Sequence, residues 1–575
     1  MSLIDGVKSL FTPVNRATDG QGVLDELPEL KLEMDDEELV RLSDDWEKKY
    51  KEYEGEIAKK QEENEKYWKG EHFDGGDEDR PMMDNIIYEA VETFRSLATK
   101  KNPEPFVRGD NTEKGKSLAK SVQQMLIFHA DRLRLKIKIK TAILYHELYL
   151  LAYAKHGWDE VEDDITTSIR RPQNLILDPT ATINEEMEHT GQYIGERMEA
   201  SAKELIKRFP SKKEYITKKV NGKLGTTVKY TEWWSNNPSE YVFWKMDKVI
   251  LGKAKNPHWN YENTKNTIDE FGNENPESVP GVNHFRSPKA PYTFLATLNL
   301  GVQPHNVTSN IGQNLSNQDI INKRNRQIDR NADSMNGGLI VSGERSGLNK
   351  NQATDATEAL RSGGTIFIPS GSASEAVYRD QAPALPPDVY NQLADKRESL
   401  RNIYGVRGSS PSGTMNEQTA TGKTIVREQD SDRIGGGISE YLEQFADHIY
   451  NWMTQLMYVY YDEMHSGSII GAEKSLEYVA LSKQELNIRL TVSVKEGSLI
   501  PDSDIDRANE AIELAKLNTI DPISLFDRLG FSNPKESAER LYQWRVSPDI
   551  LFPETGRILE QKMIERPQGK VPQQV

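Results

Sequence analysis

The chain has 575 residues, a formal net charge of −17 and no cysteine, and 28% of its residues are charged. This acidic balance argues against a protein that coats nucleic acid tightly, because such affinity comes from Lys and Arg neutralising phosphates. It is compatible with a surface past which nucleic acid slides. The lack of cysteine excludes disulfides and thiolate metal sites and predicts a reducing, cytoplasmic origin. There is no secretion signal and no apolar run near the roughly 20 residues that span a bilayer, so we expect a soluble product without membrane contact.

The length predicts about three or four structural units. Residues 1–34 hold scattered Gly and Pro and are expected to form a loose N-terminal arm. A helix is then predicted from Asp36 to about Trp68, since its first turn is acidic and apolar residues recur at three- and four-residue steps. The acidic loop at 71–79 lacks the alternating ligands of a calcium site and is interpreted as a solvated turn.

Helices followed by strands are expected up to residue 311. Helices are predicted at 86–97 and over the long region 114–156, which can bend near residues 133–139 and ends in an apolar, core-like run. From Gly157 the pattern changes to strands and one capped helix. The strands are expected at 158–161, 174–177, 193–199, 228–234, 241–245, 248–251 and 292–298, with the helix at 201–209 and a basic surface segment at 212–224. Trp233 and Trp234 are interpreted as core and rim of the sheet. Residues 258–280 are rich in Asn, Glu and Pro and are interpreted as a long loop or a mobile insertion.

Two polar helices bracket a Gly-rich insert in the middle of the chain. Both predicted helices, 315–335 and 387–404, carry only a thin apolar seam, whereas a globular core helix has a wider apolar face. The seam residues are Ile321, Ile328, Ala332 and Met335 in the first helix, and Val389, Leu393, Leu400 and Ile403 in the second. The insert is expected to be mostly β, with strands at 339–341, 365–368 and 376–378. Two readings fit equally: a stalk that packs against copies of itself, or a surface hairpin with a β decoration.

The C-terminal third begins with a Gly/Ser/Pro loop at 405–415. A very long helix is predicted from 416 to 463 with a break at Gly435, Gly436 and Gly437, and its aromatic second half is interpreted as a packed core face. Strands are predicted at 476–481 and 486–494. Helices at 503–517, 523–529 and 534–544 would form a C-terminal unit, followed by a disordered tail at 566–575.

Signals for catalysis are weak. Residues 421–424 read Thr-Gly-Lys-Thr, but a phosphate-binding loop needs glycine at position 417, where Glu417 would repel phosphate. The histidines are dispersed, with no HExxH pair, so a zinc hydrolase has no support. A two-metal nuclease stays open, because its carboxylate ligands can lie far apart in the chain. We expect no catalytic residues, no metal and no cofactor.

Seven short phrases in the expected order resemble portal (head-to-tail connector) proteins of tailed bacteriophages. Each is weak alone, and their order along most of the chain carries the resemblance. The phrases are Tyr-Trp-Lys-Gly at 67–70, Asn-Pro-Glu-Pro at 102–105, His-Gly-Trp-Asp at 156–159, Asn-Leu-Ile-Leu-Asp-Pro-Thr-Ala at 174–181, Pro-Lys-Ala-Pro-Tyr at 288–292, Gly-Val-Gln-Pro at 301–304 and Thr-Ala-Thr-Gly at 419–422.

The resemblance implies an α+β portal-type fold that assembles as a dodecameric ring around a DNA channel. It assigns a wing (35–311 and 416–503, the latter with the long kinked helix), stem helices (312–336 and 386–404), a small β/α clip (337–385), a tunnel loop (405–415) and a helical crown (504–565). The glycine break departs from the continuous long helix of the family. The implied partners are further copies of the chain, the major capsid protein, terminase, head-completion (adaptor) and tail proteins, and double-stranded DNA bound without sequence preference. The implied location is the portal vertex of the virion, after synthesis in the bacterial host cytoplasm.

Site residues follow from these assignments. For the DNA channel, weak phosphate contacts are expected from cations of the stem and tunnel loop: Lys323, Arg324, Arg326, Arg330, Arg397, Arg401, Arg407 and Lys423. For partner binding at the clip, the candidates are Arg345, Lys350, Arg361 and Arg379. A solvated, salt-bridged stalk explains the stem cations better than a dedicated DNA-contact stripe, because Asp319, Asp329 and Asp333 nearly balance them. In a ring, the thin seams are expected to be subunit contacts.

Two rival functions remain at this point. One is a magnesium-dependent nucleotide- or DNA-processing enzyme, and the other is a non-viral oligomeric scaffold. Turnover of ATP or DNA with magnesium would favour the enzyme, and closed rings with a central hole would favour the conduit.

Overall fold

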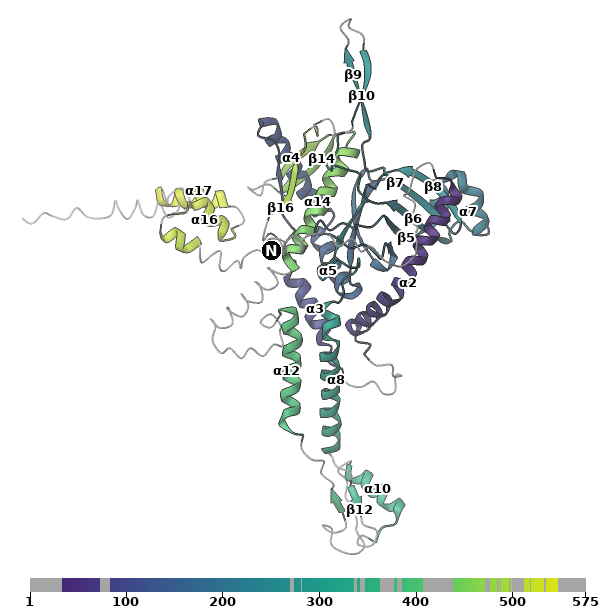
Figure 1. Ribbon diagram of the computed structural model, residues 1–575. Helices are drawn as coiled ribbons and strands as arrows, with labels where there is room; N and C mark the ends of the chain where they lie inside the picture. Colours follow the sequence, from purple (N-terminus) through teal and green to yellow (C-terminus); the bar gives the residue numbers. More distant parts are fainter. Residues whose placement is uncertain are drawn as a thin grey trace, which may run out of the picture.

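Figure 1 shows the computed structural model, in which helices and sheets form a body from which two long helices project. The described residues are 34–72, 83–268, 274–280, 282–335, 339–341, 347–361, 377–379, 385–406, 438–470 and 476–546, the last with gaps at 483–484, 487, 496–497, 499–510, 518 and 532–533. The mixed helix and sheet content agrees with the predicted α+β class. The predicted N-terminal arm, the loop at 71–79, the tunnel loop beyond Val406 and the C-terminal tail lie wholly or largely outside the described residues.

Helix α2 (Asp36–Lys69) confirms the first predicted helix. A capping box fixes its start: Asp35 accepts a hydrogen bond from the Glu38 backbone N–H at 2.8 Å, and Glu38 accepts one from the Asp35 N–H at 3.2 Å. Gly70 ends it with φ 82°, in the left-handed region that favours glycine. The apolar face of α2 packs on α5 (Leu135–Tyr149) and β8 (Val249–Lys255).

The long helical region predicted at 114–156 is confirmed up to residue 149, with the expected bend at Arg134, and is wrong beyond that residue. It divides into α4 (Glu113–Arg132), α5 and strand β2 (Ala152–Asp159). Arg134 (φ 51°) separates the two helices, and Leu150 (φ 63°) ends α5 before the strand begins. Residues 148–154 are all buried, so their apolar character has no period that distinguishes a helix end from a strand start. The preceding helix α3 (Ile86–Leu97) is as predicted.

Two antiparallel sheets follow. The first has the order β11 (Tyr292–Leu295), β2, β3 (Asp164–Arg170). The second has the order β4 (Leu175–Leu177), β5 (Tyr193–Ser201), β6 (Thr227–Ser235), β7 (Tyr241–Met246), β8. The link between β5 and β6 holds the predicted capped helix α6 (Ala202–Arg208), the 3₁₀ turn η3 (Pro210–Lys212) and α7 (Lys213–Lys219), and η2 (Pro172–Asn174) precedes β4. The predicted meander of three strands is confirmed as β6, β7 and β8.

Trp233 and Trp234 are both core residues, so the prediction of a rim position is wrong. Successive residues of a strand face opposite sides, and here both sides of β6 are covered. Trp233 is 0% exposed and lies 5.4 Å from Trp46 of α2, centroid to centroid. Trp234 is 2% exposed and stacks on His258 at 6.0 Å.

The long loop predicted at 258–280 is instead a β-hairpin. Strands β9 (Glu262–Ile268) and β10 (Glu274–Pro280) pair antiparallel, with Glu262 opposite Pro280, and Figure 1 shows them projecting from the body. The sequence lacks the alternation of apolar and polar residues that marks a half-buried strand. The pairing therefore depends on backbone hydrogen bonds that no periodicity reveals.

Helix α14 (Glu440–Tyr460) is the centre of the larger core. Most of its aromatic side chains are buried as predicted, including Phe445, Tyr450 and Tyr458, but Tyr441 in the first turn is exposed. The Tyr450 hydroxyl donates to the Pro103 carbonyl at 2.6 Å. The half of the predicted long helix before Ile438, with its glycine break, lies outside the described residues. Beside α14, β1 (Pro105–Arg108) pairs with β16 (Thr491–Val494), and β14 (His465–Ile470) pairs with β15 (Leu476–Leu481). Strands β1 and β14 were not predicted.

Near the C-terminus, α16 (Pro522–Arg528) and α17 (Pro534–Val546) confirm two of the three helices predicted there. They pack on each other. Asp521 begins α16 by accepting hydrogen bonds from the Ile523 and Ser524 backbone N–H groups at 3.0 Å.

Candidate functional site: a two-helix stalk and its distal unit

Helices α8 (Asn310–Met335) and α12 (Pro387–Tyr404) run antiparallel and form a stalk that ends in a small α/β unit (Figure 1). Helix α12 has the predicted bounds, with Gly405 as its C-cap at φ 68°. Helix α8 begins five residues before the predicted Leu315. The Ser309 hydroxyl accepts from the Gly312 N–H at 3.1 Å, and the Glu147 carboxylate accepts from the Asn310 N–H at 3.1 Å. An anion from another element thus stabilises this N-terminus.

The thin seams of the stalk pack within one chain. Ile321 and Leu400 are fully buried, Val389 and Leu393 are 8% exposed, and Ile328 packs against the same cluster. Each helix therefore supplies the apolar partner of the other. The expectation that the seams contact neighbouring subunits is wrong for these residues, and the predicted seam member Ala332 is exposed.

Amide side chains join the stalk to the body. Gln318 Oε1 accepts from the backbone N–H groups of Ile86 and Ile87 at 3.2 and 3.3 Å, and thereby caps the first turn of α3. Its Nε2 donates to the Asp84 carbonyl at 2.6 Å and to Asn322 Oδ1 at 3.1 Å. Gln318 is fully buried, so these bonds fix how the stalk leaves the body.

Three of the predicted channel cations bond to a different element of the same chain. Arg401 is 8% exposed and donates to both carboxylate oxygens of Glu89 at 3.2 Å. Arg397 forms an ion pair with Asp84. Arg324 donates from Nε to Gln392 Oε1 at 2.5 Å and so ties α8 to α12. The first two interactions hold α12 on α3 and on Asp84, two residues before α3. All three side chains therefore have a structural role.

The remaining predicted channel cations differ in exposure. Lys323 and Arg330 are exposed on α8. Arg326 is half-buried and donates from Nε to the Asn322 carbonyl at 3.3 Å. Arg407 and Lys423 lie outside the described residues, as does the Thr-Gly-Lys-Thr motif at 421–424.

The distal unit is less purely β than predicted. Strands β12 (Leu339–Val341) and β13 (Val377–Arg379) pair antiparallel, but helix α10 (Lys350–Arg361) lies between them in the chain. Asn349 begins this helix by accepting from the Gln352 N–H at 3.0 Å, while Gln352 accepts from the Asn349 N–H at 3.1 Å. This reciprocal cap was the missed signal. The strand predicted at 365–368 lies outside the described residues.

The four clip candidates are only partly placed. Lys350 is exposed at the start of α10. Arg361 is the last residue of α10 and Arg379 the last of β13, but their side chains are outside the description, and so is all of Arg345. The proposed role of these cations in partner binding stays a prediction.

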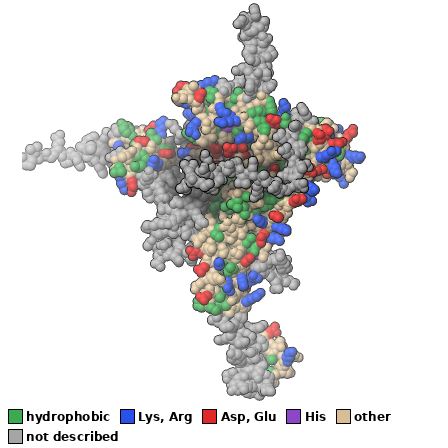
Figure 2. Space-filling view, in the orientation of Figure 1, with side chains coloured by type: hydrophobic (Ala, Val, Ile, Leu, Met, Phe, Trp, Pro, Cys, Tyr) green, Lys and Arg blue, Asp and Glu red, His purple; other side chains and the backbone are tan. Residues whose placement is uncertain are grey.

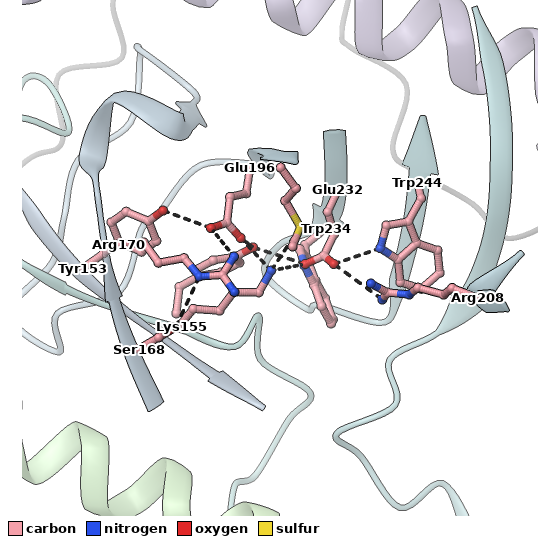
Figure 3. Close-up of polar contacts among 11 residues, drawn as sticks. Tyr153, Lys155, Ser168, Arg170, Glu196, Arg208, Glu232, Trp234 and Trp244 are labelled. Carbon is pink, nitrogen blue, oxygen red and sulfur yellow. Dashed lines mark hydrogen bonds and ion pairs between the residues drawn. The ribbon is translucent and has the colours of Figure 1, made fainter. Parts of the chain in front are cut away.

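A buried charge network between the two sheets was not predicted (Figure 3). Lys155 of β2 donates to Glu196 of β5 and to Glu232 of β6, at 2.6 Å each. Arg170 donates to Glu196 at 2.9 Å and Arg208 lies 3.8 Å from Glu232, so three cations surround two carboxylates. Trp234 and Trp244 donate their indole N–H groups to Glu232 at 2.7 and 2.8 Å, and Tyr153 and Tyr292 donate to Glu196.

The pKa shifts in this network keep Glu232 ionised and the phenols of Tyr153 and Tyr292 protonated. Burial by itself raises the pKa of Glu232, but Lys155 and the two indole donors lower it to about 2. Burial raises the pKa of Tyr153 and of Tyr292 well above the usual value, so both phenols stay protonated and donate. Because both carboxylates have cationic partners and accept further hydrogen bonds, the network has the features of a structural joint between the sheets.

Within the described residues, no group of three or more His, Asp or Glu is placed to hold a metal ion. Burial lowers the pKa of His129 and of His156 to about 3, and both rings are neutral, hydrogen-bonded core residues. None of the helices in the described part of the chain combines the length and apolar character that crossing a membrane requires. No protein-family model matches this chain, and no curated protein matches it.

Proposed function

We propose that this chain is a portal (head-to-tail connector) protein of a tailed bacteriophage. Twelve copies would form a ring at one capsid vertex, through which double-stranded DNA passes during terminase-driven packaging and again at ejection. The ring would contact the major capsid protein at its rim. Its clips would bind terminase first and then the head-completion proteins that join the tail. The protein would act as a conduit, without catalysis.

The observation that carries this proposal is the stalk. Two antiparallel helices project from the body and carry a small α/β unit at their far end, as the stem and clip of a portal would. Their apolar seams are closed within the chain, and Gln318 and Arg401 anchor them rigidly. The outward surface of the stalk is therefore polar, which suits helices packed side by side around a hydrated channel.

Electron micrographs of the purified full-length chain test the proposal. We expect closed rings with a central hole, with twelvefold symmetry for rings taken from virions. Rings made by the isolated protein can differ in subunit number, so particle closure is the criterion. A chain that stays monomeric at high concentration, or that hydrolyses ATP or DNA with magnesium, would overturn the proposal and favour the enzyme.

A further inference from the structure

The exposed basic residues of the stalk lie on α8, and the exposed charges of α12 are all acidic. Helix α8 exposes Lys323 and Arg330 together with Asp319 and Asp329, whereas α12 exposes Asp388, Asp395 and Glu398. Among the described residues, none of these side chains forms an ion pair in the chain. Figure 2 shows blue and red side chains on the α8 side of the stalk and red ones on the α12 side. Each helix therefore carries exposed charges that have no ion-pair partner among the described residues.

The basic pair forms one face of α8. Lys323 and Arg330 are seven residues apart, which brings them within about 20° of each other around a helix of 3.6 residues per turn. Lys323 is two residues after the seam residue Ile321, and Arg330 is two residues after Ile328. Two residues correspond to a rotation of about 200° around the helix axis. The pair therefore points away from α12. On this outer face, nearer the body, Asp319 accepts from the Tyr67 hydroxyl at 2.6 Å.

The acidic residues form the matching face of α12. Asp388 and Asp395 are also seven residues apart, and Glu398 follows three residues later, on the same side. The seam residues of α12 are Val389, Leu393 and Leu400, roughly opposite this face. The stalk thus has a basic outer edge on one helix and an acidic outer edge on the other, facing in different directions.

The charged residues of the two edges also lie at similar heights along the stalk axis. The bond between Arg324 and Gln392 places these residues side by side. Since the helices are antiparallel, Lys323 lies level with position 393 and Arg330 with position 386. Asp395 and Asp388 are each two residues from those positions, or about 3 Å along the helix. Rotation about a ring axis parallel to the stalk does not change the height of a residue along that axis. In a neighbouring copy, Asp395 would therefore lie near the height of Lys323, and Asp388 near the height of Arg330.

We propose that the basic edge of α8 in one copy docks on the acidic edge of α12 in the next copy around the ring. This inference rests on the proposed function, which supplies the ring. A contact between two different faces of the same chain is heterologous, and such contacts build closed rings when the rotation closes. Lys323 and Arg330 then contact the neighbouring subunit, and their predicted role as phosphate contacts in the channel is replaced.

Charge reversal on each edge tests the docking. The first variant of the full-length chain carries Lys323→Glu and Arg330→Glu, so both of its edges are acidic. The second carries Asp388→Lys and Asp395→Lys, so its α8 edge is basic and Glu398 is the one carboxylate left among the three residues that define its acidic edge. Each alone is expected to lose most rings in electron micrographs and in sedimentation velocity at low salt, while urea unfolding shows a folded subunit. The control for the first variant, Lys51→Glu with Lys59→Glu on exposed positions of α2, makes the same change in net charge away from the stalk and should keep its rings.

Mixing gives the decisive measurement. An equal mixture of the two variants should regain rings of alternating subunits, and a chain that carries all four reversals should form rings alone. Variants that keep their rings, or a mixture that regains none, would overturn the docking and leave the proposed function intact. A wild-type chain that forms no rings would overturn the proposed function and the docking with it.

Discussion

Arg401 on α12 and Glu89 on α3 form an ion pair across 312 residues of sequence, with one guanidinium nitrogen 3.2 Å from each carboxylate oxygen. The guanidinium side chain is 10% exposed and the carboxylate 27%. The pair lies where the stalk meets the body. It therefore couples the orientation of the stalk to the packing of the core.

Replacing Arg401 by Ala should destabilise the subunit. The change leaves Glu89 half-buried without its cation, and we expect the free energy of unfolding to fall by roughly 1–3 kcal/mol, below the range for a fully buried pair. Urea unfolding measures this loss. Glu89→Gln in the same background should cost little more, because the two residues share one interaction. An Arg401→Ala chain of unchanged stability but weaker DNA binding would restore the channel role predicted for Arg401.

The network around Glu232 should make stability depend on pH under acid conditions. The folded-state pKa, about 2, is below the ordinary value of 4.5, so the unfolded chain binds a proton first as pH falls. The contribution of Glu232 is fully present above pH 4.5 and is lost between that pH and about 2. Urea unfolding of Glu232→Gln should show a shallower fall in stability across this window. An equally steep fall in that variant would mean that other groups cause it.

Asp447 on α14 should have the opposite effect. Its Oδ1 is buried without a hydrogen-bond partner among the described residues, and burial raises its pKa from 3.8 to about 6. The folded state then holds a proton that the unfolded chain has released, so stability falls as pH rises from about 4 to past 6. Asp447→Asn should therefore stabilise the protein at pH 8 by roughly 1–3 kcal/mol and have little effect at pH 4.

Thermal unfolding at the two pH values measures this difference for Asp447. Glu440→Gln, at an exposed position in the first turn of the same helix, is the control and should show no such dependence. Equal effects of Asp447→Asn at pH 4 and pH 8 would contradict the assigned cause.

Two glycine substitutions should change stability with opposite signs. A Cβ at Gly195 in β5 would lie 2.6 Å from the ring of Trp233, the residue opposite it on β6. Gly195→Ala should therefore destabilise the protein by roughly 1–3 kcal/mol, since the buried indole must move. Gly55 is exposed within α2, with open space around its Cβ position, and Gly55→Ala should stabilise by about 0.5–1 kcal/mol. Differential scanning calorimetry of both variants compares the two shifts, and the same sign for both would be inconsistent with this packing.

Local signals in the sequence were enough to predict several individual helices and strands of this protein. The cap at Asp35, the proline and glycine at the ends of α12, and the alternation in β6 to β8 act within a few residues, so their patterns can be read without the rest of the chain. The aromatic face of α14 could be predicted for the same reason. The order of elements also suggested a stalk with a distal unit.

Only the tertiary structure decided what these elements contact. The early start of α8 depends on Glu147, and the burial of Trp234 depends on His258 and other residues far away in the sequence. Whether a seam faces a second helix of the same chain or a neighbour is a question of partners, and a thin seam looks the same in both cases. Tertiary contacts also decide which cations are paired within the chain, such as Arg401, and which are exposed, such as Lys323. Charge is a property of a residue, but its pairing depends on which carboxylate the fold brings within reach.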